Sequence, residues 1–338
     1  MDASERLALQ VLESRSVTLG RLVYLGWYRP IAFVAKCWRE GPLNLWLAAG
    51  GRRAMESAVA SLPSFEAAPR DAPAVYFLTG RAFWYQTAFC AHTLLAHAER
   101  PLRIVIVDDG TLDASHADEF RRIFASVRIV WADEVERRLD IALPADGFPA
   151  LRQRRLVYPH LRKLTDIHAG ETGWKLVLDS DMLFHGHPGF ILDWLDAPDR
   201  PCHMADIEDA YGYSIELMTE LAGAPIPRRV NVGLCGLNSD TIDWHLLETW
   251  CRATLEREGG HYLQEQALVA MMMAGVARAA APEEQYKVRP SRVETIHPSA
   301  ALHHYVAESK AWYFRFGWRG ALYHSLQARR RTDEQALS

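Results

Sequence analysis

Continuous apolar runs alternate with helical stretches over residues 74–181. A run without polar alternation predicts a strand buried on both faces, and helices between such strands predict a parallel sheet. The predicted strands are 74–80, 102–110, 127–132 and 174–181, and the predicted helices between them are 82–98, 115–124 and 151–170. We therefore expect the first half of the chain to be a doubly wound α/β fold.

The second half is less regular but continues as strands and helices. A Gly-rich strand is predicted at 230–239, helices at 243–257 and 263–274, and short strands at 286–289 and 301–306. The Pro/Ala-rich segment AAPRDAP is the best candidate for a domain boundary. We expect a helical extension over 1–73, one α/β sandwich domain over 74–325 and a solvated tail over 326–338.

The helical segment 151–170 is basic and is interrupted by Pro159, which predicts a kink or a new start. Arg152, Arg154 and Arg155 precede this proline, and the default expectation for such a group is a solvated basic face.

Composition excludes several classes of function. A net charge of -4 provides no overall basic field for nucleic acid. The five cysteines form no CxxC pair, which argues against a disulfide framework or a zinc finger and fits a reducing compartment. Asp2 and Glu5 stand where a signal peptide needs basic residues. A cytoplasmic location is the expectation.

Residues 17–50 are rich in Trp, Tyr and Leu but are interrupted by arginines, Lys36 and two prolines. No stretch of about 20 apolar residues remains to span a bilayer. The favoured interpretation is a helical elaboration packed on the main domain. The alternative is contact with a membrane surface, which would place the protein at the inner face of a membrane.

The strand WKLVL ends in Asp179-Ser180-Asp181. Side chains alternate along a strand, so the two carboxylates are expected to point the same way and to repel each other unless a cation lies between them. A divalent metal is the simplest resolution, and a pair of turn-forming aspartates is the alternative. Thr79, Gly80 and Asp108 stand at the ends of two other strands, at the sheet edge where α/β folds bind ligands.

Four further elements accompany this pair in chain order. A basic residue, Lys163, stands 16 positions before Asp179, and VNVGLCGLNS supplies an Asn-x-Gly. YLQEQALVAMM then supplies an acid-Gln pair at the start of a helix, and HYVAESKAW combines His, Lys and Trp. The residues concerned are Asn231, Gly233, Glu265, Gln266, His304, Lys310 and Trp312.

These elements together resemble the GT-A nucleotide-sugar glycosyltransferases, most closely the retaining branch typified by glycogenin and the bacterial lipopolysaccharide galactosyltransferases. The resemblance covers residues 74–316 and leaves 1–73 outside. Three positions depart from the family pattern: Glu265 replaces an Asp, Ala307 a Gly and Ala311 a Pro. The Ala307 change weakens the assignment of the diphosphate-binding backbone.

The resemblance implies a GT-A fold, with a Rossmann-like mixed sheet, and a bacterial metal-dependent hexosyltransferase. It implies metal ligation by Asp179, Asp181 and His304. This mixed oxygen and imidazole set suits Mn²⁺ better than Mg²⁺. The implied donor contacts are Thr79, Gly80, Asp108, Lys163, Ser180, Gly233, Lys310 and Trp312, and the implied catalytic residues are Asn231, Glu265 and Gln266.

The implied reaction is transfer of a sugar from a nucleotide-diphosphate sugar to an acceptor hydroxyl, with UDP as the expected nucleotide and retention as the expected outcome. The acceptor stays open between a glycan, a lipid-linked sugar and a small molecule. For Asp108, contact with uracil and a simple Asp-Gly turn are equally supported. Two other functions remain: a non-catalytic nucleotide-sugar-binding protein, and a haloacid dehalogenase-type phosphatase that uses the Asp-x-Asp as its nucleophile motif.

Overall fold

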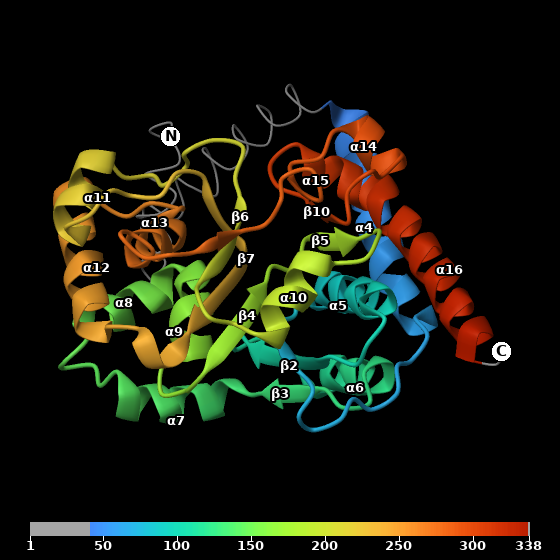
Figure 1. Cartoon of the computed structure of the whole chain (residues 1–338), viewed down its shortest axis with the longest axis horizontal. Coiled ribbons are helices and arrows are strands. Elements are labelled where there is room, and N and C mark those ends of the chain that lie inside the picture. Colours follow the sequence, from blue (N-terminus) through green and yellow to red (C-terminus); the bar gives the residue numbers. More distant parts are fainter. Residues whose placement is uncertain (1–40, 337–338) are drawn as a thin grey trace.

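A seven-stranded mixed sheet lies at the centre of the computed structural model, which describes residues 41–336 (Figure 1). The strand order is β3-β2-β1-β4-β7-β6-β8. The strands are β1 Ala74–Thr79, β2 Arg103–Asp108, β3 Arg128–Val130, β4 Trp174–Leu178, β6 Cys202–Ala205, β7 Val230–Asn238 and β8 Ala279–Ala280. Strands β1 to β4 run parallel, and β7 is antiparallel to both β4 and β6. The predicted α/β class with a mixed sheet is confirmed.

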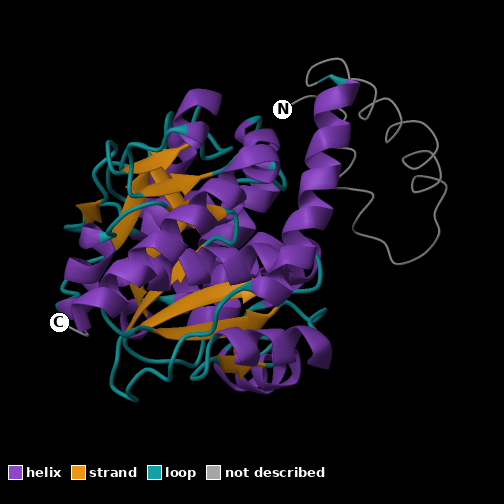
Figure 2. Cartoon of the chain, turned by 90° about the vertical axis from the view of Figure 1, so that its right-hand side faces the viewer, coloured by secondary structure: helices purple, strands orange, loops and turns teal. Residues whose placement is uncertain are grey.

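Helices cover both faces of this sheet, as Figure 2 shows from the side. One apolar core lies between the sheet and helices α4, α5, α6 and α16, and a second lies on the other face beneath α7, α8, α9, α11, α12 and α13. Their bounds are α4 Pro42–Ala58, α5 Trp84–Ala98, α6 Ala114–Ile123, α7 Ala132–Ala142, α8 Pro149–Val157, α9 Arg162–His168, α11 Ile215–Ala222, α12 Trp244–Glu258, α13 Gln264–Met272 and α16 Trp318–Ala336.

A second, three-stranded sheet joins distant parts of the chain. Its order is β5-β10-β9, with β5 Met182–Phe184, β9 Tyr286–Val288 and β10 Leu302–His304. Strand β10 pairs antiparallel with β5, and His304 is opposite Met182. This pairing places His304, near the end of the domain, beside Met182, the residue that follows Asp181.

Short helices surround this second sheet. They are α10 Gly189–Asp196, α14 Arg292–Ile296, α15 Ser309–Trp312 and the π-helix η5 Tyr313–Gly317. None of these short helices, and neither β5 nor β6, was predicted from the sequence.

The basic segment 151–170 breaks at the proline, as predicted: α8 ends at Val157 and α9 begins at Arg162. The expectation of a solvated basic face is wrong for Arg154 and Arg155, each only 3% exposed. Arg155 donates to both carboxylate oxygens of Asp166, at 2.5 and 2.8 Å, so its charge is compensated inside the domain.

Helix α4 packs on η5 through a glycine. A Cβ atom on Gly51 would lie 2.0 Å from the carbonyl oxygen of Phe314. Residues 17–40 of the segment discussed above lie outside the described residues. Helix α16 continues to Ala336, through most of the predicted tail, while the division of the chain at 73 and 325 stays a prediction. Within residues 41–336 no helix has both the length and the apolarity to cross a bilayer.

The glycine pair in α4 offers a matched test of this packing. We expect Gly51→Ala to lower the free energy of unfolding by about 1–3 kcal/mol, because the new methyl group must push α4 away from Phe314. Gly50→Ala meets no atom within 4 Å and should be neutral or stabilising by up to about 1 kcal/mol. Equilibrium denaturation of both variants measures the difference, and equal effects would show that α4 does not dock as described.

Candidate functional site

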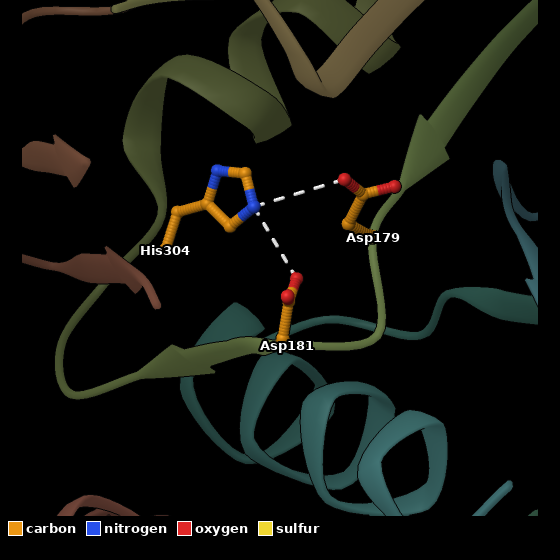
Figure 3. Close-up of side chains that lie close together, drawn as sticks. All are labelled: Asp179, Asp181 and His304. Atoms are coloured by element: carbon orange, nitrogen blue, oxygen red, sulfur yellow. Dashed lines mark ion pairs between the residues drawn. The ribbon is translucent and has the colours of Figure 1, made fainter. Parts of the chain in front are cut away.

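Asp179, Asp181 and His304 converge on one point beyond the end of β4 (Figure 3). Their candidate ligand atoms all lie within 4.8 Å of one another. The His304 Nε2 atom is 3.7 Å from Asp179 Oδ2 and 3.2 Å from Asp181 Oδ1. The strand-alternation argument is wrong in its detail, since β4 ends at Leu178 and both carboxylates lie in the turn that leads to β5. They converge because the chain turns between β4 and β5, where His304 on β10 pairs opposite Met182.

The three side chains fit a divalent metal by chemistry as well as by distance. His304 is 2% exposed, and its Nε2 atom faces the two carboxylates, as Figure 3 shows. Its Nδ1 atom has no hydrogen-bond partner among the described residues. Two carboxylates and an imidazole are a common set for Mn²⁺ and similar ions.

Two lysines neutralise the carboxylates in this state of the site. Lys310 Nζ lies 2.9 Å from Asp181 Oδ2, and Lys163 Nζ lies 2.8 Å from Asp179 Oδ1. Burial disfavours the ionised form of Asp181, but Lys310 and His304 overcome this and hold the pKa of Asp181 well below its usual range. The Asp181 carboxylate in turn raises the pKa of Lys310.

Gly233 on β7 leaves the space that His304 occupies. A Cβ atom at this position would lie 2.3 Å from His304 Cε1 and 2.7 Å from the methyl group of Met182. The Gly233 carbonyl also accepts a 2.7 Å hydrogen bond from the Asp179 amide. The glycine of the Asn-x-Gly motif thus positions two of the three candidate ligands.

Lys163 and Glu265 form a buried pair beside the same carboxylate. Lys163 Nζ is 3.2 Å from Glu265 Oε2 and 3.4 Å from the Val232 carbonyl. Burial opposes the charge on Lys163, but Asp179 and Glu265 raise its pKa above the usual value. Burial raises the pKa of Glu265 to about 7, with Lys163 opposing and Asp179 adding to the rise. Glu265, which stands where the resemblance expects an Asp, therefore changes charge near neutral pH.

Asn231 and Gln266 meet at a carboxylate that the sequence did not reveal. Their side-chain amides lie 2.9 and 3.3 Å from Asp206 Oδ2, and all three side chains are buried. Gln266 also donates to the Ala210 carbonyl at 2.6 Å. Asp206 directly follows β6, and β6 was not predicted, so its place at the carboxyl edge of the sheet was missed. The run CHMAD, an apolar segment closed by an acid, was the available signal.

The ends of β1 and β2 form the third part of this edge. Asp108 Oδ1 accepts from the amides of Gly110, Thr111 and Leu112 at 2.8–3.1 Å, which are the contacts expected of the turn interpretation. A Cβ atom on Gly80 would lie 1.9 Å from Asp109 Oδ1, so the two strand ends touch here. An open cleft of about 700 Å³ adjoins them, lined by Arg81, Ala82, Gly110, Thr111 and Leu112.

The remaining predicted residues differ in their placement. The Thr79 hydroxyl is buried and accepts from Thr87 at 2.9 Å, and Ser180 lies half-buried in the turn between the two carboxylates. The ring of Trp312 instead stacks on Phe316 and lies beneath the guanidinium groups of Arg292 and Arg315.

Ala307 stands where the resemblance expects glycine, and it adopts a positive φ of 50°. Glycine takes this left-handed conformation without cost, whereas alanine does not. The backbone between β10 and α15 therefore has the shape that favours glycine, although the side chain differs.

Several solved structures are similar to this chain. The galactosyltransferase LgtC in complex with donor and acceptor sugar analogues superposes with a TM-score of 0.49 and 15% identity, over 75% of this chain and 95% of LgtC. Apo mouse xyloside xylosyltransferase 1 gives 0.47 and 11%, over 69% and 97%. GlyE from Streptococcus pneumoniae TIGR4 gives 0.42 and 12%, over 76% and 63%. All three are glycosyltransferases.

No protein-family model and no curated protein matches the chain. Since every identity above is below 25% and every TM-score below 0.5, the similarities assign no activity to this chain. Any inference about function therefore rests on the residues of the site.

Gly233→Ala is expected to weaken Mn²⁺ binding by about 10-fold or more, because its methyl group would displace His304. Gly186→Ala is the matched control from the neighbouring loop, where the nearest atom would be the Ala301 Cα at 3.7 Å. Titration calorimetry with Mn²⁺ compares the two variants. Unchanged affinity in Gly233→Ala would remove His304 from the proposed ligand set.

Glu265 predicts a pH dependence of stability. Its folded-state pKa of about 7 exceeds the ordinary value of 4.5, so the folded protein binds this proton more tightly than the unfolded chain does. The resulting stabilisation, of about 3 kcal/mol, is complete below pH 4.5 and is lost as the pH rises through about 7. Glu265→Gln should therefore lose less stability than the wild type between these pH values. Denaturant unfolding in EDTA tests this, with the exposed Glu256→Gln as control, and parallel pH curves for Glu265→Gln and wild type would contradict it.

Proposed function

We propose that this protein is a metal-dependent glycosyltransferase that uses a nucleotide-diphosphate sugar. The observation that supports this best is the convergence of Asp179, Asp181 and His304 at the carboxyl edge of the sheet, with Lys163 and Lys310 beside them. A cation flanked by two further positive charges suits a diphosphate better than it suits a neutral substrate.

The three candidate ligands would hold Mn²⁺ or Mg²⁺, and Mn²⁺ is the better match to an imidazole ligand. Such an ion, when bound, neutralises the charge that develops on a nucleoside diphosphate leaving group. Lys163 and Lys310 already lie within 3 Å of the two carboxylates, so each could turn from a carboxylate to a phosphate oxygen with a short movement.

The buried polar cluster of Asn231, Gln266 and Asp206 would contact the transferred sugar. Asn231, Gln266 and Asp206 present amide and carboxylate groups in a buried cluster, as recognition of sugar hydroxyls requires. Glu265 would stabilise positive charge on the sugar, or position the acceptor, in a transfer with retention. The cleft beside Gly80 and Asp108 would take the base, with UDP as the expected nucleotide.

Asp179→Asn and Asp181→Asn test this function. Each should lower metal-dependent release of sugar from the donor by about 100-fold or more, because an amide cannot supply the ligand charge. A screen of nucleotide sugars with Mn²⁺, read out as thermal stabilisation and slow donor hydrolysis, identifies the donor first. The exposed Asp118→Asn is the control for a lost surface carboxylate. Full turnover in both site variants would refute the assignment.

The same experiments separate the rival functions. Stabilisation by UDP and Mn²⁺ without sugar release from any donor would indicate a non-catalytic binding protein, a rival that the alanine at position 307 keeps open. An acid-stable phosphoryl group on Asp179 would instead indicate the phosphatase.

A further inference from the structure

Two arginines share one aromatic stack at the end of α15. The rings of Trp312 and Phe316 are stacked, with centroids 6.3 Å apart and an interplanar angle of 20°. The guanidinium carbon of Arg292 lies 5.8 and 5.6 Å from these two centroids, and that of Arg315 lies 5.5 and 4.9 Å from them. We call these four residues the arginine-aromatic cluster.

Neither arginine of the cluster has a carboxylate partner within residues 41–336. Arg315 donates instead to the Asn44 side-chain oxygen of α4. Other arginines of the domain are paired, such as Arg155 with Asp166 and the nearby Arg289 with Glu308. The cluster thus keeps two uncompensated positive charges in a protein whose net charge is -4.

Exposed apolar side chains border the cluster. On α14, Val293 is 71% exposed and Ile296 is 43% exposed, and their spacing from Arg292 puts all three on one side of this short helix. On α4, Leu43 beside Asn44 is 66% exposed. Helices α14, α15 and α4 lie near one another in Figure 1, and both α14 and α4 contact η5.

We propose that the arginine-aromatic cluster docks on the anionic headgroups of a phospholipid membrane. Unpaired guanidinium groups complement phosphate charge, and aromatic rings with polar neighbours are the residues that favour the bilayer interface. The neighbouring Val293, Ile296 and Leu43 supply apolar area for shallow insertion. The segment 17–40, which leads into α4, has the same mixture of aromatic, apolar and basic residues in its sequence.

Docking here also narrows the acceptor, and this step rests on the proposed function. Helix α15 carries both Lys310, the partner of Asp181, and Trp312 of the cluster. A membrane on the cluster would therefore lie at one edge of the metal site. The acceptor class that this arrangement favours is a sugar carried by a membrane lipid.

Vesicle sedimentation of the full chain tests the docking, at about 0.15 M salt. We expect binding to vesicles of phosphatidylglycerol mixed with phosphatidylcholine, and none to phosphatidylcholine alone. Arg292→Gln/Arg315→Gln should lower the partition coefficient roughly 30-fold, since each basic side chain near an anionic surface contributes about a factor of five. Arg121→Gln/Arg137→Gln removes the same charge from α6 and α7, which lie along the bottom of Figure 1 while α14 and α15 lie at its top, and should bind like the wild type.

Three results would overturn the docking proposal. They are equal binding to both vesicle types, wild-type binding by Arg292→Gln/Arg315→Gln, and a wild-type dimer that this double variant converts to a monomer, which would make the face a contact between copies. Stabilisation of the wild type, but not of the double variant, by inorganic phosphate without vesicle binding would indicate a site for a free anion instead.

The docking and the transfer activity can fail separately. Mn²⁺-dependent thermal stabilisation of Arg292→Gln/Arg315→Gln should match the wild type, since neither arginine contacts a candidate metal ligand. Vesicle binding without donor hydrolysis would refute the glycosyltransferase and leave the docking intact.

Discussion

The repulsion between Asp179 and Asp181 is the constraint on which this site depends. Two carboxylates in one turn are stable only if positive charge reaches them from elsewhere. That charge comes from α9 through Lys163 and from α15 through Lys310, while β10 brings the imidazole of His304 between them. Elements separated by more than a hundred residues in sequence must therefore assemble around one turn. The second sheet brings these elements together, since the pairing of β5 with β10 begins at Met182, one residue after Asp181.

Close packing at two glycines also shapes the site. The missing side chain of Gly233 admits His304, and the missing side chain of Gly80 admits the Asp109 turn. Both glycines lie at the carboxyl edge of the sheet, where strand ends converge. A Cβ atom on either glycine would lie within 2.3 Å of these side chains, far inside van der Waals contact, so the space for them depends on glycine at both positions.

Sequence alone predicted those strands and helices whose apolar residues form a clear local pattern. Strands β1 to β4 and β7 lie within stretches dominated by apolar residues, and α5, α12 and α13 have clear bounds, so local pattern was sufficient for them. Strands β5 and β6, of three and four residues, were not predicted. Their length alone does not explain this, since β3, β9 and β10 are also three residues long and lie within predicted strands.

The candidate site likewise contains residues that the sequence predicted and residues that it did not. The candidate metal ligands Asp179, Asp181 and His304 could be predicted because the spacing of their motifs can be read from the sequence. Asp206 was not, because its role depends on where β6 pairs with β7. The burial of Arg154 was equally invisible, since its partner Gln264 lies 110 positions away. In general the sequence revealed which residues carry chemistry but not which partners neutralise them.

The two lysines also have a thermodynamic consequence. A cation that enters between Asp179 and Asp181 has to compete with ammonium groups already in contact with those carboxylates, so its affinity for the empty protein is lower than three ligands alone would give. An anion that draws the lysines away removes this competition. By linkage the cation must then strengthen binding of the anion by the same factor. Under the proposed function, binding of the metal and of the diphosphate would be coupled in this way, and each would bind more weakly in the absence of the other.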